Sequence, residues 1–182
     1  MSNPVFGVGI VAFFLMPDEW SLVKTQGMPE CLGLREAGNL QWVADGSMRS
    51  GLIVRHGEEQ RTYLFQVFVE SIFEGEKAER HVAKRLAKIQ RNKSITLVRY
   101  GDVPSGGHQG KYMLWTRRSR AFLIGKGRME AVLEFYIYCN ITKRVLRLRL
   151  STSKPDSMMK DAEKLISMLS STGCHGHVLR SE

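Results

Sequence analysis

The sequence predicts an α+β protein: one mostly antiparallel β-sheet with helices packed on it. Three observations predict this class. Strand-like and helix-like segments come in blocks rather than in a regular strand–helix alternation. Residues 129–173 have the pattern of a β-hairpin followed by an amphipathic helix. The 182 residues suit a single domain with a sizeable core, of which only residues 174–182 are expected to fray.

The hairpin is the best-specified element. Residues 132–139 and 144–151 carry apolar side chains at every second position, so each strand has one apolar face. A turn over Ile141-Thr142 makes three apolar pairs: Ile137–Leu146, Phe135–Leu148 and Leu133–Leu150. The same register predicts an aromatic–cation pair and a salt bridge on the other face, Tyr136–Arg147 and Glu134–Arg149. A slip of one residue would bury both arginines, so the register is well specified.

The first third of the chain is predicted to be rich in β-strands. Residues 5–16 are apolar but too short to span a bilayer, and no basic residue precedes them, so we expect a buried strand rather than an export signal. Further strand candidates are residues 20–22, 31–35, 40–44, 49–55 and 62–70. The last is almost continuously apolar, which is typical of a strand buried on both faces in the middle of a sheet.

A helix is predicted over residues 76–91. Its apolar stripe consists of Ala78, Val82, Leu86 and Ile89, at helical spacing. A second, basic stripe lies on the opposite side and is flanked by Arg80 and Arg85. Its members are Lys77, His81, Lys84, Lys88 and Arg91. A basic outer face of this kind either tracks an anionic partner or only keeps the helix soluble.

The second half begins with a predicted strand over residues 94–100 and a glycine-rich loop over residues 101–110. Residues 111–116 and 121–124 are further strand candidates, with a basic cluster between them. After the hairpin, a helix is predicted over residues 155–171, because Pro155 suits a first turn and Gly173 suits a helix stop. Its apolar face consists of Met158, Ala162, Leu165, Ile166 and Leu169.

Residues 16–20, Met-Pro-Asp-Glu-Trp beside an N-terminal strand, resemble the start of PsbP-like and Mog-type domains, a superfamily that includes the DcrB group. The order of strands and helices is also similar over most of the chain. This resemblance implies an α/β/α sandwich and a non-enzymatic binding or assembly role. It assigns no binding residue to this sequence.

Catalytic and cofactor motifs are not found in the sequence. Neither a phosphate-binding glycine motif nor a G-x-S-x-G or H-E-x-x-H motif occurs, and we expect no cofactor. Of the three cysteines, Cys139 and Cys174 either form a disulfide or stay as buried thiols. Cys174, His175 and His177 are zinc-ligand types, but a chain terminus gives a metal site little support.

The net charge of +9 and the isoelectric point near 9.7 favour an anionic partner. The expected surface residues are Lys77, His81, Lys84, Lys88, Arg91, Arg117, Arg118, Arg120, Tyr136, Tyr138, Arg147 and Arg149. We predict a cytoplasmic binding or adaptor module for an acidic protein partner, of undetermined oligomeric state. The alternatives are a nucleic-acid-binding domain, in which the tyrosines stack bases, and an enzyme with a dispersed active site. If a helix covers the tyrosines, they belong to the core instead.

Overall fold

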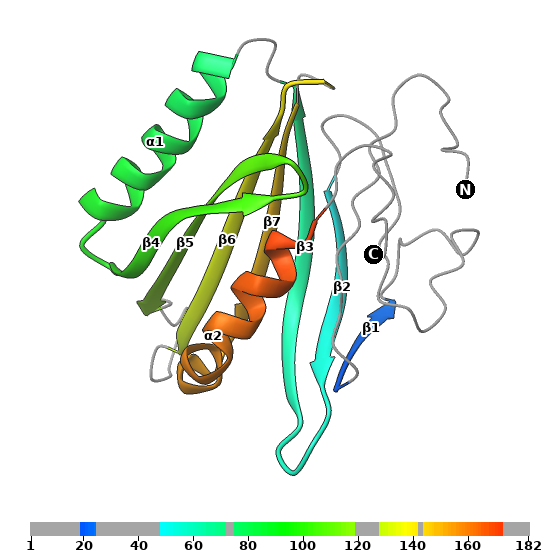
Figure 1. Ribbon diagram of the computed structural model, residues 1–182. Helices are drawn as coiled ribbons and strands as arrows, with labels where there is room; N and C mark the ends of the chain where they lie inside the picture. The colour runs from blue at the N-terminus through cyan, green and yellow to red at the C-terminus, as the bar shows by residue number, and fades with distance from the viewer. Residues whose placement is uncertain (1–18, 25–47, 72–74, 119–127, 142–143, 173–182) are drawn as a thin grey trace, which may run out of the picture.

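The computed structural model describes residues 19–24, 48–71, 75–118, 128–141 and 144–172 (Figure 1). They form a seven-stranded antiparallel sheet in the order β1-β2-β3-β7-β6-β5-β4, with two helices. The strands are β1 Trp20–Lys24, β2 Met48–Arg55, β3 Arg61–Ser71, β4 Ile95–Ser105, β5 His108–Arg118, β6 Met129–Cys139 and β7 Arg144–Thr152. The helices are α1 Gly75–Arg91 and α2 Pro155–Ser170. The predicted α+β class is confirmed.

The β6–β7 hairpin has the predicted register. Leu133 lies opposite Leu150, and Glu134 lies opposite Arg149; the other three predicted pairs are also present. The hairpin sits in the interior of the sheet, between β3 on one side and β5 on the other. Every side chain from Ala131 to Ile137 is buried, because both faces of this part of β6 are covered.

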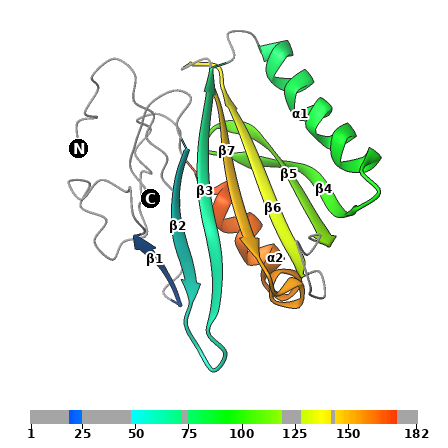
Figure 2. The same cartoon turned by 180° about the vertical axis from the view of Figure 1, so that it is seen from behind.

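Helix α2 covers one face of the sheet. Its buried side chains include Met158, Leu165 and Leu169, which join one core cluster with Phe135 and Leu148 of the hairpin. Figure 1 shows α2 in front of the sheet, and in Figure 2 the strands β6 and β7 lie in front of it. The apolar faces predicted for the hairpin and this helix therefore meet in the main core.

Helix α1 packs on the opposite face. Val82 and Ile89 belong to a second buried cluster, together with Trp115, Tyr136 and Val145 of the strands. One helix on each side of the sheet gives the α/β/α layering that we expected. The helix contacts β4 and β6, so it lies over only one half of the sheet.

Strand β3 is interior, as predicted, but the prediction that both of its faces are buried is wrong. Tyr63, Phe65 and Val67 are buried on the face that α2 covers, whereas Thr62 is exposed and Leu64 is 39% exposed. The reason is the position of α1, which packs over the other half of the sheet. The apolar run therefore alternates between a buried and a more open face.

The glycine-rich loop predicted over residues 101–110 is also wrong. Strands β4 and β5 continue to a two-residue turn at Gly106 and Gly107, whose φ angles are +51° and +82°. A two-residue hairpin turn needs such angles, and glycine adopts them without strain. Pro104 is tolerated because β4 is an edge strand. The glycines thus make a tight hairpin rather than a loop.

Several predictions fall outside the described residues: the strands over residues 5–16, 31–35, 40–44 and 121–124, and the frayed end over residues 174–182. The two alternatives for Cys139 and Cys174, a disulfide or two thiols, fall there too, because Cys174 lies outside the described residues; Cys139 itself is buried. Among the residues that the structure describes, no helix is long and apolar enough to cross a membrane.

Candidate functional site

Glu134 forms the polar centre of the face under α1. Its side chain is fully buried and accepts two hydrogen bonds from Arg85, at 3.1 Å from Nε and 2.8 Å from a terminal nitrogen. The Tyr136 hydroxyl donates a third at 2.9 Å. Burial raises the pKa of Glu134, but these hydrogen bonds and the charges of Arg85 and Arg147 outweigh it, so the pKa lies below its ordinary value. Arg85, expected to flank a surface stripe, instead ties α1 to the sheet.

The two hairpin arginines have partners other than those predicted. The guanidinium of Arg147 lies 3.9 Å from the centre of the Phe68 ring, a cation–π contact. Arg149 lies 3.3 Å from a carboxylate oxygen of Glu130 and 3.4 Å from the amide oxygen of Gln66. Both side chains are about four-fifths buried. Glu134 therefore lies opposite Arg149 in the sheet, and Tyr136 lies opposite Arg147, as predicted. The side-chain contacts differ, because Arg85 donates to Glu134, whereas Arg147 stacks on Phe68.

Tyr136 is only 2% exposed, so it is a core residue and has no ring face open to a base. Burial, and then the charge and hydrogen bond of Glu134, raise its pKa. The tyrosine therefore stays a hydrogen-bond donor to Glu134 across the ordinary pH range. The helix covers this face, as in the core alternative that we considered.

The α2 side has its own buried acid, Asp161. One of its oxygens lies 2.6 Å from a nitrogen of Arg55 and 2.9 Å from a nitrogen of Arg61. The other accepts a 2.6 Å hydrogen bond from the hydroxyl of Tyr63, which also contacts the carbonyl of Ser157. This cluster fastens α2 to β2 and β3, so its charged groups serve the fold.

Three of the predicted basic residues on α1 are exposed and lie on one side of the helix. Lys84, Lys88 and Arg91, with Ala87 and Asn92, line an open hollow of about 480 Å³. Two of them, Lys88 and Arg91, stand in the last helical turn, where positive charge is favoured by the helix dipole.

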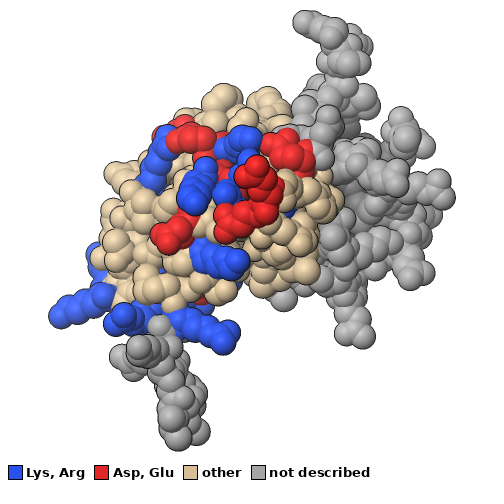
Figure 3. Space-filling view, turned by 90° about the horizontal axis from the view of Figure 1, so that it is seen from below, with Lys and Arg blue, Asp and Glu red and all other residues tan. Residues whose placement is uncertain are grey.

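More exposed cations lie where the chain leaves α1. The backbone N–H of Ile95 donates to the carbonyl of Asn92 at 2.9 Å, and Ile95 pairs with Arg117 in the sheet. This brings the end of α1 to the end of β5. We call the whole set the basic edge; its exposed members are Lys84, Lys88, Arg91, Lys93, Arg117, Arg118 and Arg128. Figure 3 shows Lys and Arg gathered at one edge of this end, whereas acidic and basic side chains alternate over the middle.

The remaining predicted residues are not members of the basic edge. The side chain of Lys77 and all of Arg120 lie outside the described part. His81 is half-buried on α1, and Tyr138 is half-buried on β6. Sequence reasoning missed Lys93, which stands two residues beyond Arg91, and Arg128, which joins the others only because the strand ends meet.

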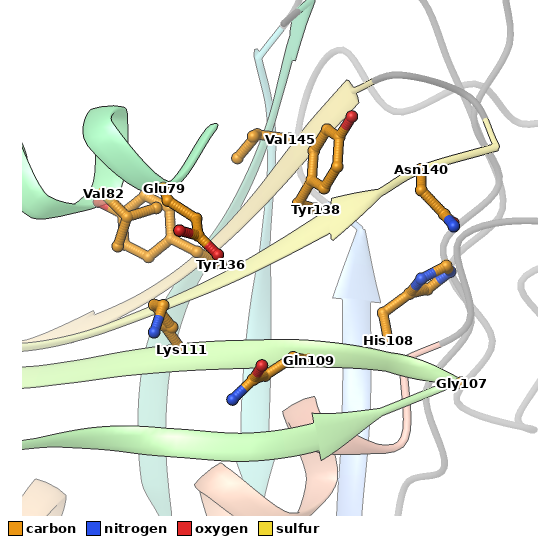
Figure 4. A pocket seen from close by; sticks show the side chains of 10 residues that line it. All are labelled: Glu79, Val82, Gly107, His108, Gln109, Lys111, Tyr136, Tyr138, Asn140 and Val145. Atoms are coloured by element: carbon orange, nitrogen blue, oxygen red, sulfur yellow. The ribbon is translucent and has the colours of Figure 1, made fainter. Parts of the chain in front are cut away.

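A groove separates α1 from the strands on the side away from the basic edge. One hollow of about 360 Å³ is lined by Glu79, Val82, Gly107, His108, Gln109, Lys111, Tyr136, Tyr138, Asn140 and Val145 (Figure 4). A second hollow of about 290 Å³ shares Glu79, Val82 and Lys111 with the first. Because they share these three residues, the two hollows lie next to each other; we call them together the groove, which has an apolar floor and charged walls.

Within the described ranges, no three His, Cys, Asp or Glu side chains are grouped as metal ligands would be. The Cys174, His175 and His177 segment considered for zinc lies outside those ranges. The expectation that the protein has no cofactor is untested.

Comparison with known proteins gives the fold only. No family model matches the sequence, and no curated protein matches it significantly. The solved structures with a similar fold include two with a TM-score of 0.53 each. One is PA94 of Pseudomonas aeruginosa, a protein of unknown function; identity is 15%, over 90% of this chain and 99% of that one. The other is LpqN of Mycobacterium tuberculosis, involved in cell envelope biogenesis; identity is 12%, over 95% of this chain and 88% of that one.

Proposed function

We propose that this protein is a binding or adaptor module that holds an acidic protein partner on the basic edge. The observation that carries the proposal is the gathering of seven exposed cations from α1 and three strand ends along one edge; three of them line one hollow. Of these, Arg117 is bonded to an acid, Glu130, at 2.6 Å. A cluster of one sign raises the local concentration of oppositely charged partners.

An acidic protein is favoured over nucleic acid because the proposed stacking residues are not at the basic edge. Tyr136 is buried. Tyr138 lies near the last residue of β6, whereas Glu130, which pairs with Arg117, lies near the first. A nucleic acid would therefore depend on phosphate contacts alone, which position a nucleic acid without reading it.

The family and location belong to the same proposal. The resemblance to PsbP-like and Mog-type domains is supported by one helix on each face of an antiparallel sheet, and it implies a binding or assembly role. A cytoplasmic location is supported by the absence of a disulfide framework pattern among the three cysteines of the sequence. LpqN shares the fold and is involved in cell envelope biogenesis, so location needs its own measurement.

The test is a titration of fluorescein-labelled poly-glutamate with the protein, followed by anisotropy from 20 to 500 mM NaCl. We expect saturable binding at low salt that weakens as salt rises, because exposed charges are screened. Lys84→Glu combined with Lys88→Glu reverses two charges of the basic edge and should weaken binding roughly tenfold. Lys154→Glu combined with Lys160→Glu also reverses two exposed charges, at the start of α2, and should change the affinity less than twofold.

Single- and double-stranded DNA oligonucleotides of equal net charge run through the same series. Tighter binding of either DNA than of poly-glutamate, lost in the Lys84→Glu, Lys88→Glu variant, would replace the acidic-protein proposal with the nucleic-acid one. Binding of neither polymer at 20 mM NaCl would reject both.

A further inference from the structure

We infer that the groove between α1 and strands β4 to β6 binds a small organic amine that carries an aromatic ring. The groove is built from the two hollows that share Glu79, Val82 and Lys111. None of its lining residues belongs to the basic edge. The site is therefore independent of the proposed protein-binding surface.

The floor of the groove favours an apolar ring. Val82, Tyr136 and Val145 are each at least 93% buried and still line the larger hollow. The half-buried ring of Tyr138 lies beside them. Small-molecule sites combine such an apolar lining with a few polar groups that fix orientation, and aromatic rings stack on one another with a preferred offset geometry.

The charged side chains that line the groove determine which ligand charge is favoured. Lys111 is already engaged by Asp102, with 2.5 Å between the ammonium nitrogen and the carboxylate oxygen. The Glu79 carboxylate forms no ion pair or hydrogen bond within the described part, and Figure 4 shows it directed over Tyr136 into the groove. Glu79 and Asp102 against Lys111 leave an excess of one negative charge, in a chain whose net charge is +9.

These features match an ammonium group at Glu79 with its attached ring on the apolar floor beside Tyr138. The ammonium would donate a hydrogen bond to the unpaired Glu79 carboxylate, and the ring face of Tyr138 attracts a cation held above it. A carboxylate-bearing ligand would meet Glu79 and Asp102 instead and would have to break the Lys111–Asp102 pair. The amine is therefore the favoured chemical class.

Three probes of the same size separate the contributions: 2-phenylethylamine, 2-phenylethanol and phenylacetate. Each is titrated into isotopically labelled protein, and backbone amide shifts give the affinity and the site. We expect saturable shifts around Lys111, Tyr136 and Tyr138 for the amine, with the alcohol roughly tenfold weaker, the difference made by one charged hydrogen bond. Phenylacetate should bind more weakly still.

Two variants test the residues. Glu79→Gln keeps the shape of the exposed side chain and should weaken the amine roughly tenfold, without changing the alcohol. Glu58→Gln makes the same change on the exposed loop between β2 and β3 and should leave all three affinities unchanged. Tyr138→Leu keeps apolar volume but removes a ring, and should weaken the amine about threefold.

Equal affinities for the three probes, or amine binding that Glu79→Gln leaves intact, would overturn the inference. Tightest binding of phenylacetate would overturn it too, because Lys111 would then be the anchor. Saturable shifts confined to residues outside the groove, or no saturable shift with any probe, would show that the groove is not such a site.

Discussion

The two faces of the sheet hold their helices in different ways. On one face, eight of the 16 residues of α2 are buried, mostly aliphatic ones. On the other, Val82 and Ile89 are the buried side chains among the described residues of α1. Because half of the residues of α2 are buried in the core, little of its surface is exposed for a partner to contact. Helix α1 leaves both of its flanks open, and one borders the basic edge while the other borders the groove.

Among the described residues, each face contains one buried carboxylate, and the two differ in how many residues donate hydrogen bonds to them from across the helix–sheet interface. Asp161 on α2 receives hydrogen bonds from three sheet residues, Arg55, Arg61 and Tyr63. Glu134 on the sheet receives both of its hydrogen bonds from α1 through a single residue, Arg85. Loss of one donor therefore leaves Asp161 compensated, whereas loss of Arg85 removes both hydrogen bonds that Glu134 receives from α1.

The largest expected loss of stability tests the difference in apolar burial between α2 and α1. Leu165 of α2 is fully buried in the main core, so Leu165→Ala should lower the free energy of unfolding by about 4 kcal/mol. Val82→Ala on α1 removes less volume beside an open groove and should lower it by about 1.5 kcal/mol. Urea denaturation followed by circular dichroism measures both. Equal losses would mean that the two helices are equally important to the core.

The next largest loss of stability tests the difference between the partners of the two buried carboxylates, Glu134 and Asp161. Arg85→Ala leaves Glu134 buried without its main partner and should lower the free energy of unfolding by about 3 kcal/mol. Arg55→Ala leaves Asp161 bonded to Arg61 and Tyr63 and should cost about 1 kcal/mol. Urea titrations of the two variants under identical buffer give the comparison.

A double variant separates burial of a lone charge from loss of packing. Arg85→Met with Glu134→Leu removes both ends of the pair and should recover at least half of the loss caused by Arg85→Ala. No recovery would indicate that Arg85 acts mainly through the packing of its stem.

Much of this fold can be predicted from the sequence, because alternation fixes strand register and helical spacing fixes helix faces. The hairpin pairs and the bounds of α2 follow from these rules within a residue or two. The β4–β5 hairpin could not be predicted, because the Gly106-Gly107 turn lies among four other glycine, proline and serine breakers that typify a loop. Two-sided burial of β3 was mispredicted because helix placement is a tertiary property.

The candidate sites are less predictable. The sequence shows Lys84, Lys88 and Arg91 as a stripe with Lys93 just beyond it, but Arg128 joins them only through strand pairing. Arg85 has the same charge and neighbours as the exposed residues, and only the buried carboxylate of Glu134 distinguishes it. The groove has no sequence signal, since Glu79, Lys111 and Tyr138 come from three separate elements.

The smallest expected effect is on how the free energy of unfolding changes at acidic pH. The pKa of Glu134 is lower in the folded protein than its ordinary value of 4.5, so the unfolded chain binds more protons near that pH. Its contribution to stability is therefore complete above about pH 4.5 and is lost as the pH falls through the folded pKa. The free energy of unfolding of Glu134→Gln, measured by urea denaturation from pH 6 to pH 3, should fall less steeply than that of the unaltered protein.

Glu58→Gln supplies the control, because it removes a glutamate from an exposed loop and should keep the steep acid slope. Glu134→Gln is expected to be less stable at pH 7, so the slope with pH rather than the absolute stability is compared. A slope in Glu134→Gln as steep as in Glu58→Gln would mean that protonation of another group detaches the helices in acid. The α1 face would then have no special sensitivity to pH, and its difference from the α2 face would be one of packing alone.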